Sequence, residues 1–335
     1  MHATPSPLRT ISIGGAAYDL FISTNRTVTQ SPDGHEAFVL PLGEKIWITE
    51  VFGRCGGGAS NTSVGLSRLG CEAHFCGMLG DDQWGEQILR NLQDENVFTE
   101  AATIIEHEPS NFSVILSATS GERVILGHAA MSKHLHDVTF DRERAGSVDW
   151  VYLNHIHADS CAIEDDVIAI LTGSNHKRIT WNPGGCQIDA GIRVKNNQTL
   201  VANTDLLLLN KEEAHAFTGK EQLEHGLRIL KEIGAGVVCV TDGKRGAYAT
   251  DGKGIFFCPA PECAVVDTTG AGDAFGTAMT WALGTGKDLP TALKAGTINA
   301  MSVVGAVGSQ PGLLTETEIK ARITSAKIDI TIAPL

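Results

Sequence analysis

Short apolar runs that resemble β-strands alternate with helical patterns along most of this chain, and this alternation limits the fold more than any other feature. Residues 73–79 form one such run, and Trp84, Ile88 and Leu92 follow it at the spacing of one helix face. Such repetition is typical of βαβ units. Further apolar runs lie at residues 11–13, 150–153, 178–181, 205–209 and 236–241. Strands that are apolar on both faces suit a sheet covered by helices on both sides, so we expect an α/β fold with a mostly parallel central sheet.

Two regions interrupt this rhythm. In residues 21–52 and 111–128 polar and apolar residues roughly alternate, and Ser120 and Gly121 are turn residues within the second region. Alternation with a turn predicts antiparallel strands with one exposed face. The length of 335 residues allows two domains or one large one. We expect a single α/β domain over residues 1–335 with a small β lid inserted, and from residue 315 a closing helix and a short tail.

The charge balance limits the partners. A formal net charge of −13 argues against a general affinity for nucleic acid or anionic membranes, so any phosphate must be bound by local geometry. The N-terminal segment has no apolar leader, and no run approaches the ~20 apolar residues of a membrane span. The eight cysteines form no CxxC pair, and we interpret them as buried thiols. The expected location is the cytoplasm.

The strongest candidate for chemistry is Asp-Thr-Thr-Gly-Ala-Gly-Asp at residues 267–273. We expect Val265 and Val266 to end a strand and a buried helix to begin at Ala271. The first N–H groups of a helix have no partner within it and carry partial positive charge, so they bind anions. An ordinary glycine turn capped by an aspartate would give the same local pattern. Taken alone, the segment does not decide between the two.

A second glycine cluster, Gly-Gly-Gly-Ala-Ser-Asn at residues 56–61, opens a helix that ends near Gly70. Glycines leave the backbone bare for a ligand, and Asn61 offers a donor and an acceptor. Asp19 follows the first strand, at the carboxyl edge where open α/β sheets bind ligands. A carboxylate and an amide beside a bare floor suit a polyhydroxylated ligand, although a capping role explains each of them separately. Neither the Walker pattern nor the dinucleotide pattern is present.

Taken together, the two glycine motifs resemble the two signatures of the ribokinase-like carbohydrate kinase family, also called PfkB. Between them, residues 77–85 resemble the family's Gly-x-x-Gly-x-Asp-x-x-Gly element, and residues 210–213 its Asn-x-x-Glu motif. Residues 241–246 resemble its nucleotide-contacting turn. The resemblance covers nearly the whole chain and implies a three-layer ribokinase-like fold.

The resemblance implies transfer of the γ-phosphoryl group of ATP to a hydroxyl of a small polyhydroxylated substrate, with a sugar as the leading candidate. Asp273 would be the base that accepts the hydroxyl proton. The amides of Gly270, Ala271 and Gly272 would hold the transferring group. The residues that would bind the substrate are Asp19, Gly57, Gly58 and Asn61. Ribose kinases of the family carry Lys at the position of Gly58, so the resemblance does not specify ribose.

The nucleotide side is implied by the same resemblance. The ATP contacts would be Asn210, Thr241, Gly243, Gly246 and Asn299, the last beside the adenine. Asn210 and Glu213 would organise Mg²⁺ partly through water, although the same pair also predicts a capping box at a helix start. Many relatives bind a monovalent cation such as K⁺ at the positions of Asp267 and Thr269.

Other functions stay open at this point. A nucleoside kinase would use the same fold, with the base packed under the lid against Phe38, Trp47 or Phe112, although core packing also explains these aromatic residues. A binding protein without catalysis is disfavoured because Asp273 and the Asn-x-x-Glu pair are present. Members of the family often dimerise through the lid, so the resemblance implies a homodimer.

Overall fold

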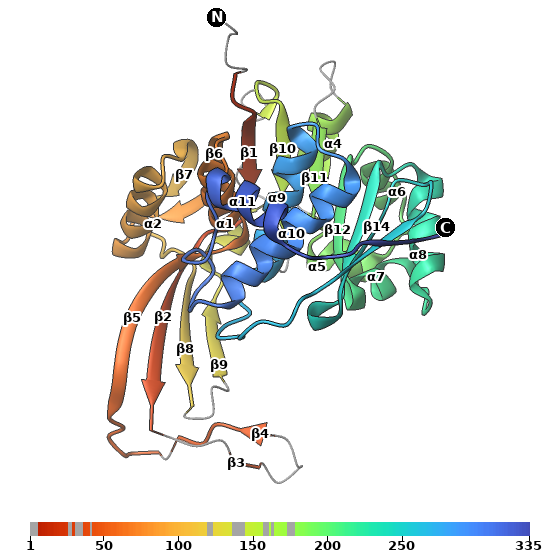
Figure 1. Cartoon of the computed structure of the whole chain (residues 1–335). Helices are drawn as coiled ribbons and strands as arrows, with labels where there is room; N and C mark the ends of the chain where they lie inside the picture. The colour runs from red at the N-terminus through yellow and green to blue at the C-terminus, as the bar shows by residue number, and fades with distance from the viewer. Residues whose placement is uncertain are drawn as a thin grey trace, which may run out of the picture.

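The computed structural model describes residues 6–25, 29–30, 36–40, 42–118, 123–135, 145–156, 161, 164–172 and 178–335. Its centre is a ten-stranded sheet (Figure 1). The strand order is β16 (Thr331–Ala333), β15 (Ile255–Pro259), β14 (Gly246–Thr250), β13 (Val237–Thr241), β12 (Leu206–Asn210), β11 (Arg178–Trp181), β10 (Trp150–Leu153), β1 (Arg9–Ile13), β6 (Glu72–Gly80) and β7 (Phe98–Ile105). The strands from β13 to β7 are parallel, whereas β14, β15 and β16 pair antiparallel.

Helices cover both faces of this sheet and give the molecule three layers (Figure 1). One face carries α1 (Gly58–Arg68), α2 (Gln83–Asp94), α9 (Ala271–Gly284), α10 (Leu289–Val304) and α11 (Glu316–Ser325). The other carries α4 (Glu164–Thr172), α5 (Gly185–Ala190), α6 (Lys195–Ala202), α7 (Lys211–Thr218) and α8 (Leu223–Ile233). The described part of the chain also contains the short 3₁₀ helices η1 (Ala130–His134) and η3 (Gly243–Arg245). Among the described residues, no helix is long and apolar enough to cross a membrane.

Strand β12 shows why the apolar runs were informative. Leu206 and Leu208 pack in the core on the α9 side, and Leu207 and Leu209 pack in the core on the α8 side. Successive side chains of a strand point to opposite faces, so a strand covered on both faces must be apolar throughout. The predicted α/β fold with a mostly parallel central sheet and a small β lid is confirmed.

The lid is a four-stranded sheet that projects from the carboxyl edge of the central sheet (Figure 1). Its order is β5 (Ile48–Gly56), β2 (Ala17–Thr24), β8 (Phe112–Ser117) and β9 (Arg123–His128), and a separate pair is formed by β3 (Thr29–Gln30) and β4 (Glu36–Ala37). The pairs β2–β5 and β8–β9 are antiparallel as predicted, but β2 and β8 run parallel. Both strands leave the same edge of a parallel sheet, so they point the same way. The predicted turn at Ser120 and Gly121 lies outside the described residues.

Two local predictions near the C-terminus are wrong. Val265 and Val266 do not end a strand: β15 stops at Pro259, and the two valines are 61% and 56% exposed. Among the described residues no strand pairs with them; instead the Val266 amide donates to the Val304 carbonyl at 2.7 Å. The segment after α11 is more than a tail, because β16 pairs antiparallel with β15 at the edge of the sheet.

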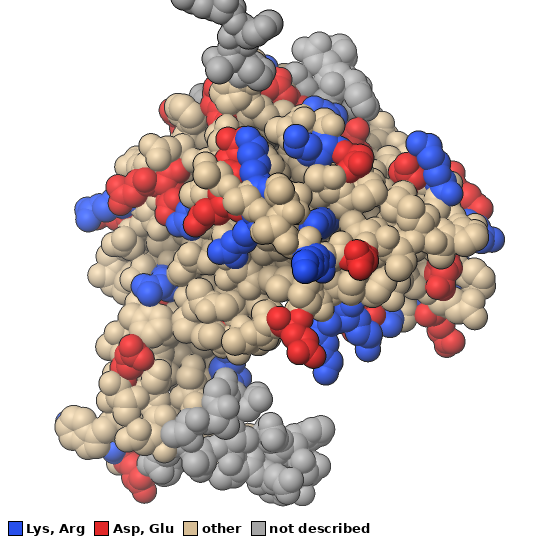
Figure 2. All heavy atoms as spheres, viewed as in Figure 1, with Lys and Arg blue, Asp and Glu red and all other residues tan. Residues whose placement is uncertain are grey.

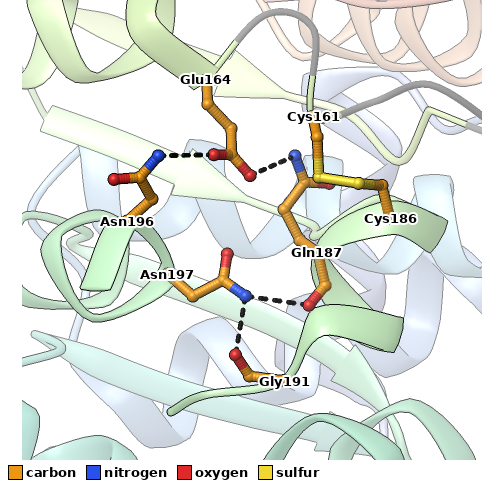
Figure 3. The surroundings of a disulfide bond; sticks show 7 residues. All are labelled: Cys161, Glu164, Cys186, Gln187, Gly191, Asn196 and Asn197. Atoms are coloured by element: carbon orange, nitrogen blue, oxygen red, sulfur yellow. Dashed lines mark hydrogen bonds between the residues drawn. A yellow bond between two sulfur atoms is a disulfide. The ribbon is translucent and has the colours of Figure 1, made fainter. Parts of the chain in front are cut away.

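The interpretation of all cysteines as buried thiols is also wrong. Cys161 and Cys186 form a disulfide (Figure 3), and Cys263 is exposed. The two bonded cysteines are 25 residues apart in the chain. The spacing of these cysteines in the sequence does not predict the pair, because only the fold brings the segment after β10 next to the start of α5.

Candidate active site

Asp273 lies in the first turn of α9, directly after the glycine loop. Gly270 caps this helix with a φ of +77°, a left-handed conformation that glycine adopts without strain. The Ala271 amide donates to the Thr268 carbonyl over a long 3.3 Å. The amides of Gly270 and Gly272 are therefore the better placed of the three predicted donors for an anion at this helix start.

Asn61 holds the carboxylate of Asp273. Its Nδ2 donates to Oδ2 of Asp273 at 2.8 Å, and its Oδ1 accepts a hydrogen bond from Oγ of Ser309, also at 2.8 Å. Ser309 packs against the backbone of Gly270 so closely that a Cβ atom added to Gly270 would lie only 2.4 Å from Cβ of Ser309. Asn61 is only 3% exposed. It was predicted to bind substrate; in the structure both ends of its amide are hydrogen-bonded within the protein, one of them to Asp273.

The environment of Asp273 prepares it to accept a proton. Burial raises the pKa of Asp273 to about 6, against the opposing effects of the Asn61 hydrogen bond and the nearby charge of His155. A general base works best when its pKa lies near the working pH. Asp273 can therefore be ionised at neutral pH and still take up a proton readily.

The glycine cluster at the start of α1 forms a bare floor. Gly57 has a φ of +89°, and a Cβ there would lie 2.5 Å from Cα of Ala16, so only glycine fits. At Gly58 a Cβ would lie 3.2 Å from Cβ of the buried Asn154. A residue with a side chain at position 58 would therefore need Asn154 to shift slightly.

Asp19 reaches this floor from lid strand β2. A Cβ on Gly56 would lie 2.5 Å from Oδ2 of Asp19, so the carboxylate occupies the space that the missing side chain leaves. Burial raises the pKa of Asp19, the hydrogen bond from Ser113 opposes this, and the charge of Asp267 adds to it. The structure thus brings Asp19 and the glycines together, as the sequence predicted.

Asn210 and Thr241 end two adjacent parallel strands, β12 and β13, where they lie opposite each other. Oδ1 of Asn210 accepts from the Glu213 amide and Oε2 of Glu213 accepts from the Asn210 amide, each at 2.8 Å. The predicted capping box is confirmed. The capping box uses only Oε2 of Glu213. The other carboxylate oxygen could accept a hydrogen bond from a water molecule bound to Mg²⁺, so Asn210 and Glu213 fit an ion that they contact through water.

The turn after β13 combines glycines with basic side chains. Gly243 and Gly246 have φ angles of +52° and +125°, which favour glycine. Between them Arg245, together with Lys211, holds the carboxylate of Asp242. Figure 2 shows Lys and Arg side chains gathered along the lower edge of the α/β body. Local positive charge at this edge would attract a polyphosphate in spite of the negative total.

The two positions predicted for a monovalent cation, Asp267 and Thr269, also lie together. Oδ1 of Asp267 accepts from the amide and the hydroxyl of Thr269 at 2.9 and 2.8 Å. The guanidinium of Arg123, from lid strand β9, contacts the same carboxylate oxygen.

A small pocket with a mostly apolar lining lies beside the disulfide. Asn154, Glu164 and Gln187 are among its lining residues. Figure 3 shows Glu164 accepting hydrogen bonds from Nδ2 of Asn196 at 2.8 Å and from Nε2 of Gln187 at 3.4 Å. Because the lining does not include Asp273, we do not take this pocket as the substrate site.

Comparison with known proteins identifies the family. The family described as pfkB family carbohydrate kinase matches residues 43–316 of the chain. The chain belongs to this family. The predictions of a ribokinase-like fold and of an ATP-dependent carbohydrate kinase are thereby confirmed.

Two curated proteins illustrate the range of pfkB relatives. The ribokinase of Bacillus subtilis is 26% identical over 79% of this chain and 86% of its own length. The aminoimidazole riboside kinase of Salmonella typhimurium is 27% identical over 76% and 82%. Among solved structures, the fold is similar to that of Arabidopsis thaliana ribokinase complexed with ribose and ATP, with a TM-score of 0.78 over 96% of this chain and 100% of that one, at 21% identity.

In this pfkB kinase Asn299 is not free to flank an adenine, and that prediction is not supported. Asn299 is 1% exposed. Its Nδ2 donates to the Ala274 carbonyl at 2.8 Å, and its Oδ1 accepts from the Leu314 amide at 3.1 Å. The side chain ties α10 to its neighbours.

Sequence reasoning missed three residues at the site of this kinase. Ser309 holds Asn61, and Gln310 donates from Nε2 to Oγ of Ser60 at 3.0 Å. Their contacts depend on how the loop after α10 folds back, which no spacing shows. The sequence does contain a signal for Arg123, because a charged residue stands there directly before the apolar run Val-Ile-Leu of a lid strand.

Proposed function

We propose that this kinase transfers the γ-phosphoryl group of ATP to a hydroxyl of a sugar, with Asp273 as the base. The observation that carries the proposal is the position of Asp273: a carboxylate with a pKa of about 6 follows directly on the amides of Gly270 and Gly272. A phosphoryl group on these amides and a hydroxyl at the carboxylate would be neighbours. Alignment of this kind is the chief requirement of phosphoryl transfer.

In this scheme the substrate lies on the floor of Gly57 and Gly58, and Asp19 binds its other hydroxyl groups. The reacting hydroxyl donates a hydrogen bond to Asp273, which takes the proton as the oxygen attacks the γ-phosphorus and ADP leaves. The backbone amides at the start of α9 stabilise the charge on the equatorial oxygens of the transferring group.

We propose that the nucleotide lies against the turn formed by Thr241, Gly243 and Gly246. Asn210 and Glu213 would hold Mg²⁺ through water molecules. Bound with ATP, this ion would neutralise charge on the phosphates.

A sugar is favoured over a nucleoside because aromatic side chains that could stack on a nucleoside base already stack on one another. Phe112, a candidate for stacking on a nucleoside base, already stacks on Trp84 with ring centroids 5.1 Å apart, and Trp84 stacks on Tyr18 at 4.5 Å. The Lys that ribose kinases carry is absent at Gly58, and a Cβ there would lie 3.2 Å from Cβ of Asn154, so a side chain at this position would need Asn154 to shift slightly. We therefore do not extend ribose to this chain.

An ADP-release assay over a panel of pentoses, hexoses and nucleosides tests this function. We expect turnover with a sugar and a loss of about 10²–10⁴-fold in kcat for Asp273→Asn. Asp288→Asn, at the N-cap of α10, is a matched control that should keep full activity. Turnover of Asp273→Asn within a few-fold of wild type would exclude this base, and turnover of nucleosides alone would exclude the sugar.

We propose a homodimer formed through the lid. Ile48, Val51, Val124, Ile125 and Leu126 are between 38% and 55% exposed. Strands β5 and β9, which carry these residues, are the two outer strands of the lid sheet. Exposed apolar side chains at a sheet edge favour association, and a second lid would cover them. Sedimentation should show a dimer for the wild type and a monomer for Ile125→Asp; a monomeric wild type would refute this.

We propose the cytoplasm as the location, because the reaction consumes ATP. The disulfide between Cys161 and Cys186 would exchange there with cellular thiols, which keep most cytosolic cysteines reduced. Trapping free thiols with a maleimide during cell lysis would show its state.

A further inference from the structure

A lid arginine reaches the loop that carries the phosphate-binding amides. Arg123 begins β9, and its guanidinium forms an ion pair with Oδ1 of Asp267 and donates from Nη2 to Oγ1 of Thr268 at 3.2 Å. The Arg123 side chain is 27% exposed and that of Asp267 only 3%. The next residues of the strand, Val124 and Ile125, are exposed. The guanidinium therefore joins the start of β9 to the α/β body.

The carboxylate of Asp267 is surrounded by donors. In addition to Arg123, Oδ1 accepts from the amide and hydroxyl of Thr269, and Oδ2 accepts from the Gly308 amide at 3.0 Å. Each of these contacts donates a hydrogen bond to the carboxylate, and donors of this kind favour its charged form. A buried anion of this kind needs a positive partner.

A free monovalent cation does not fit beside this anion. A hard cation needs several oxygen atoms with available lone pairs. Oδ1 of Asp267 already accepts from Arg123 and twice from Thr269. Arg123 also supplies the positive charge that the ion would bring. Both carboxylate oxygens of Asp267, a residue predicted to bind K⁺, therefore already accept hydrogen bonds from the chain itself.

The ion pair between Arg123 and Asp267 joins the lid to both parts of the anion site. On one side Asp267 begins the loop that leads to Gly270. On the other side it holds Gly308, whose neighbour Ser309 packs against Gly270. Through Ser309 the hydrogen bonds continue to the amide that holds the base.

We propose that Arg123 is a built-in cation of the active site, which replaces a free monovalent ion at Asp267 and holds the amides of the loop in their phosphate-binding arrangement. This inference rests on the proposed kinase activity. Arg123 is a positioning residue, because it acts through Asp267 and not on the substrate. It follows that catalysis needs no added K⁺, and that docking of the lid and ordering of the phosphate site are one event.

The test compares wild type, Arg123→Met, Arg123→Lys and a control, Arg90→Met, which removes an equal charge from the surface of α2. Activity is measured in tetramethylammonium chloride, then with K⁺ or guanidinium added at constant ionic strength. Wild type and the control should not respond to either ion. Arg123→Met should lose about 10- to 100-fold in kcat and recover when either cation is added. Arg123→Lys, which keeps the charge, should retain more activity than Arg123→Met.

Thermal unfolding without substrate gives a second measurement that needs no turnover. An ion that binds only the folded protein raises its stability by RT ln(1 + [L]/Kd), so K⁺ should raise the Tm of Arg123→Met but not that of wild type. This measurement decides the inference even if no sugar in the panel is phosphorylated. Activation or stabilisation of wild type by K⁺ would overturn it. So would full activity of Arg123→Met in tetramethylammonium, or a variant that neither cation rescues or stabilises.

Discussion

Replacing Asp273 by Asn should inactivate the enzyme and stabilise it at the same time. Burial, opposed by the hydrogen bond from Asn61, raises the pKa of Asp273 from its ordinary 3.8 to about 6. At pH 7 the folded protein therefore carries a carboxylate that would ionise more easily in the unfolded chain. A shift of about two units corresponds to about 3 kcal/mol at ~1.36 kcal/mol per unit. Asn keeps the shape of the side chain and removes this cost, so we expect a gain of up to about 3 kcal/mol in the free energy of unfolding.

The pH dependence makes this prediction specific. Between about pH 4 and pH 6 the folded state binds the Asp273 proton more tightly than the unfolded state, so wild-type stability falls as the pH rises through this window. The advantage of Asp273→Asn should be full at pH 7 and vanish near pH 4. Urea unfolding across this range measures it. Asp288→Asn is the matched control with the opposite sign, because hydrogen bonds from Thr291 lower the pKa of Asp288. The reasoning from burial would be refuted if Asp273→Asn were no more stable than wild type at pH 7, or if its gain in the free energy of unfolding persisted at pH 4.

Other perturbations give equally direct outcomes. Asn61→Ala removes the hydrogen bond that lowers the pKa of Asp273, so the acid limb of the kcat profile should move up by about one pH unit; an unchanged limb would mean that Asn61 does not act on the base. Reducing the Cys161–Cys186 disulfide, which joins residues 25 apart, should lower the free energy of unfolding by about 3 kcal/mol in denaturant titrations with and without dithiothreitol; equal midpoints would contradict this. Gly57→Ala should cost about 2 kcal/mol or more, because its Cβ would lie 2.5 Å from the Ala16 backbone at a φ of +89°, whereas Gly185→Ala meets nothing within 4 Å and should be nearly neutral.

The central sheet could be predicted because strands that are buried on both faces are apolar at nearly every position. Leu206 to Leu209 must all be apolar, and such a run is visible in any sequence. The pairing of the lid strands could not be predicted, because the parallel contact of β2 with β8 depends on where two distant segments leave the sheet. Strand β16 has three exposed residues and no pattern at all. The prediction for Val265 and Val266 was wrong because valine has a high β-propensity, and this propensity does not show whether another strand lies alongside to pair with.

At the site, local features were predictable and tertiary contacts were not. The helix start at Ala271 and the capping box of Asn210 follow from a few adjacent residues. Asn299 looks the same in sequence whether its amide faces a ligand or, as here, two backbone groups. The contacts of Ser309 and Arg123 join segments far apart in the chain, so only the folded structure reveals them.

The parallel pairing of β2 with β8 also has a consequence for the order of folding. The whole unit of β6, α2 and β7 lies between these strands in the chain. Closing so long a loop costs entropy, and non-local pairing of this kind forms slowly. Trp150, Trp181 and Trp281 are buried in the α/β body, whereas Asp19 and Arg123 belong to the lid. In refolding, burial of these three tryptophans should therefore precede the return of kinase activity, whereas Trp84, which stacks on Tyr18 and Phe112 of the lid, should report the later step. The lid then determines when a newly folded chain becomes an enzyme.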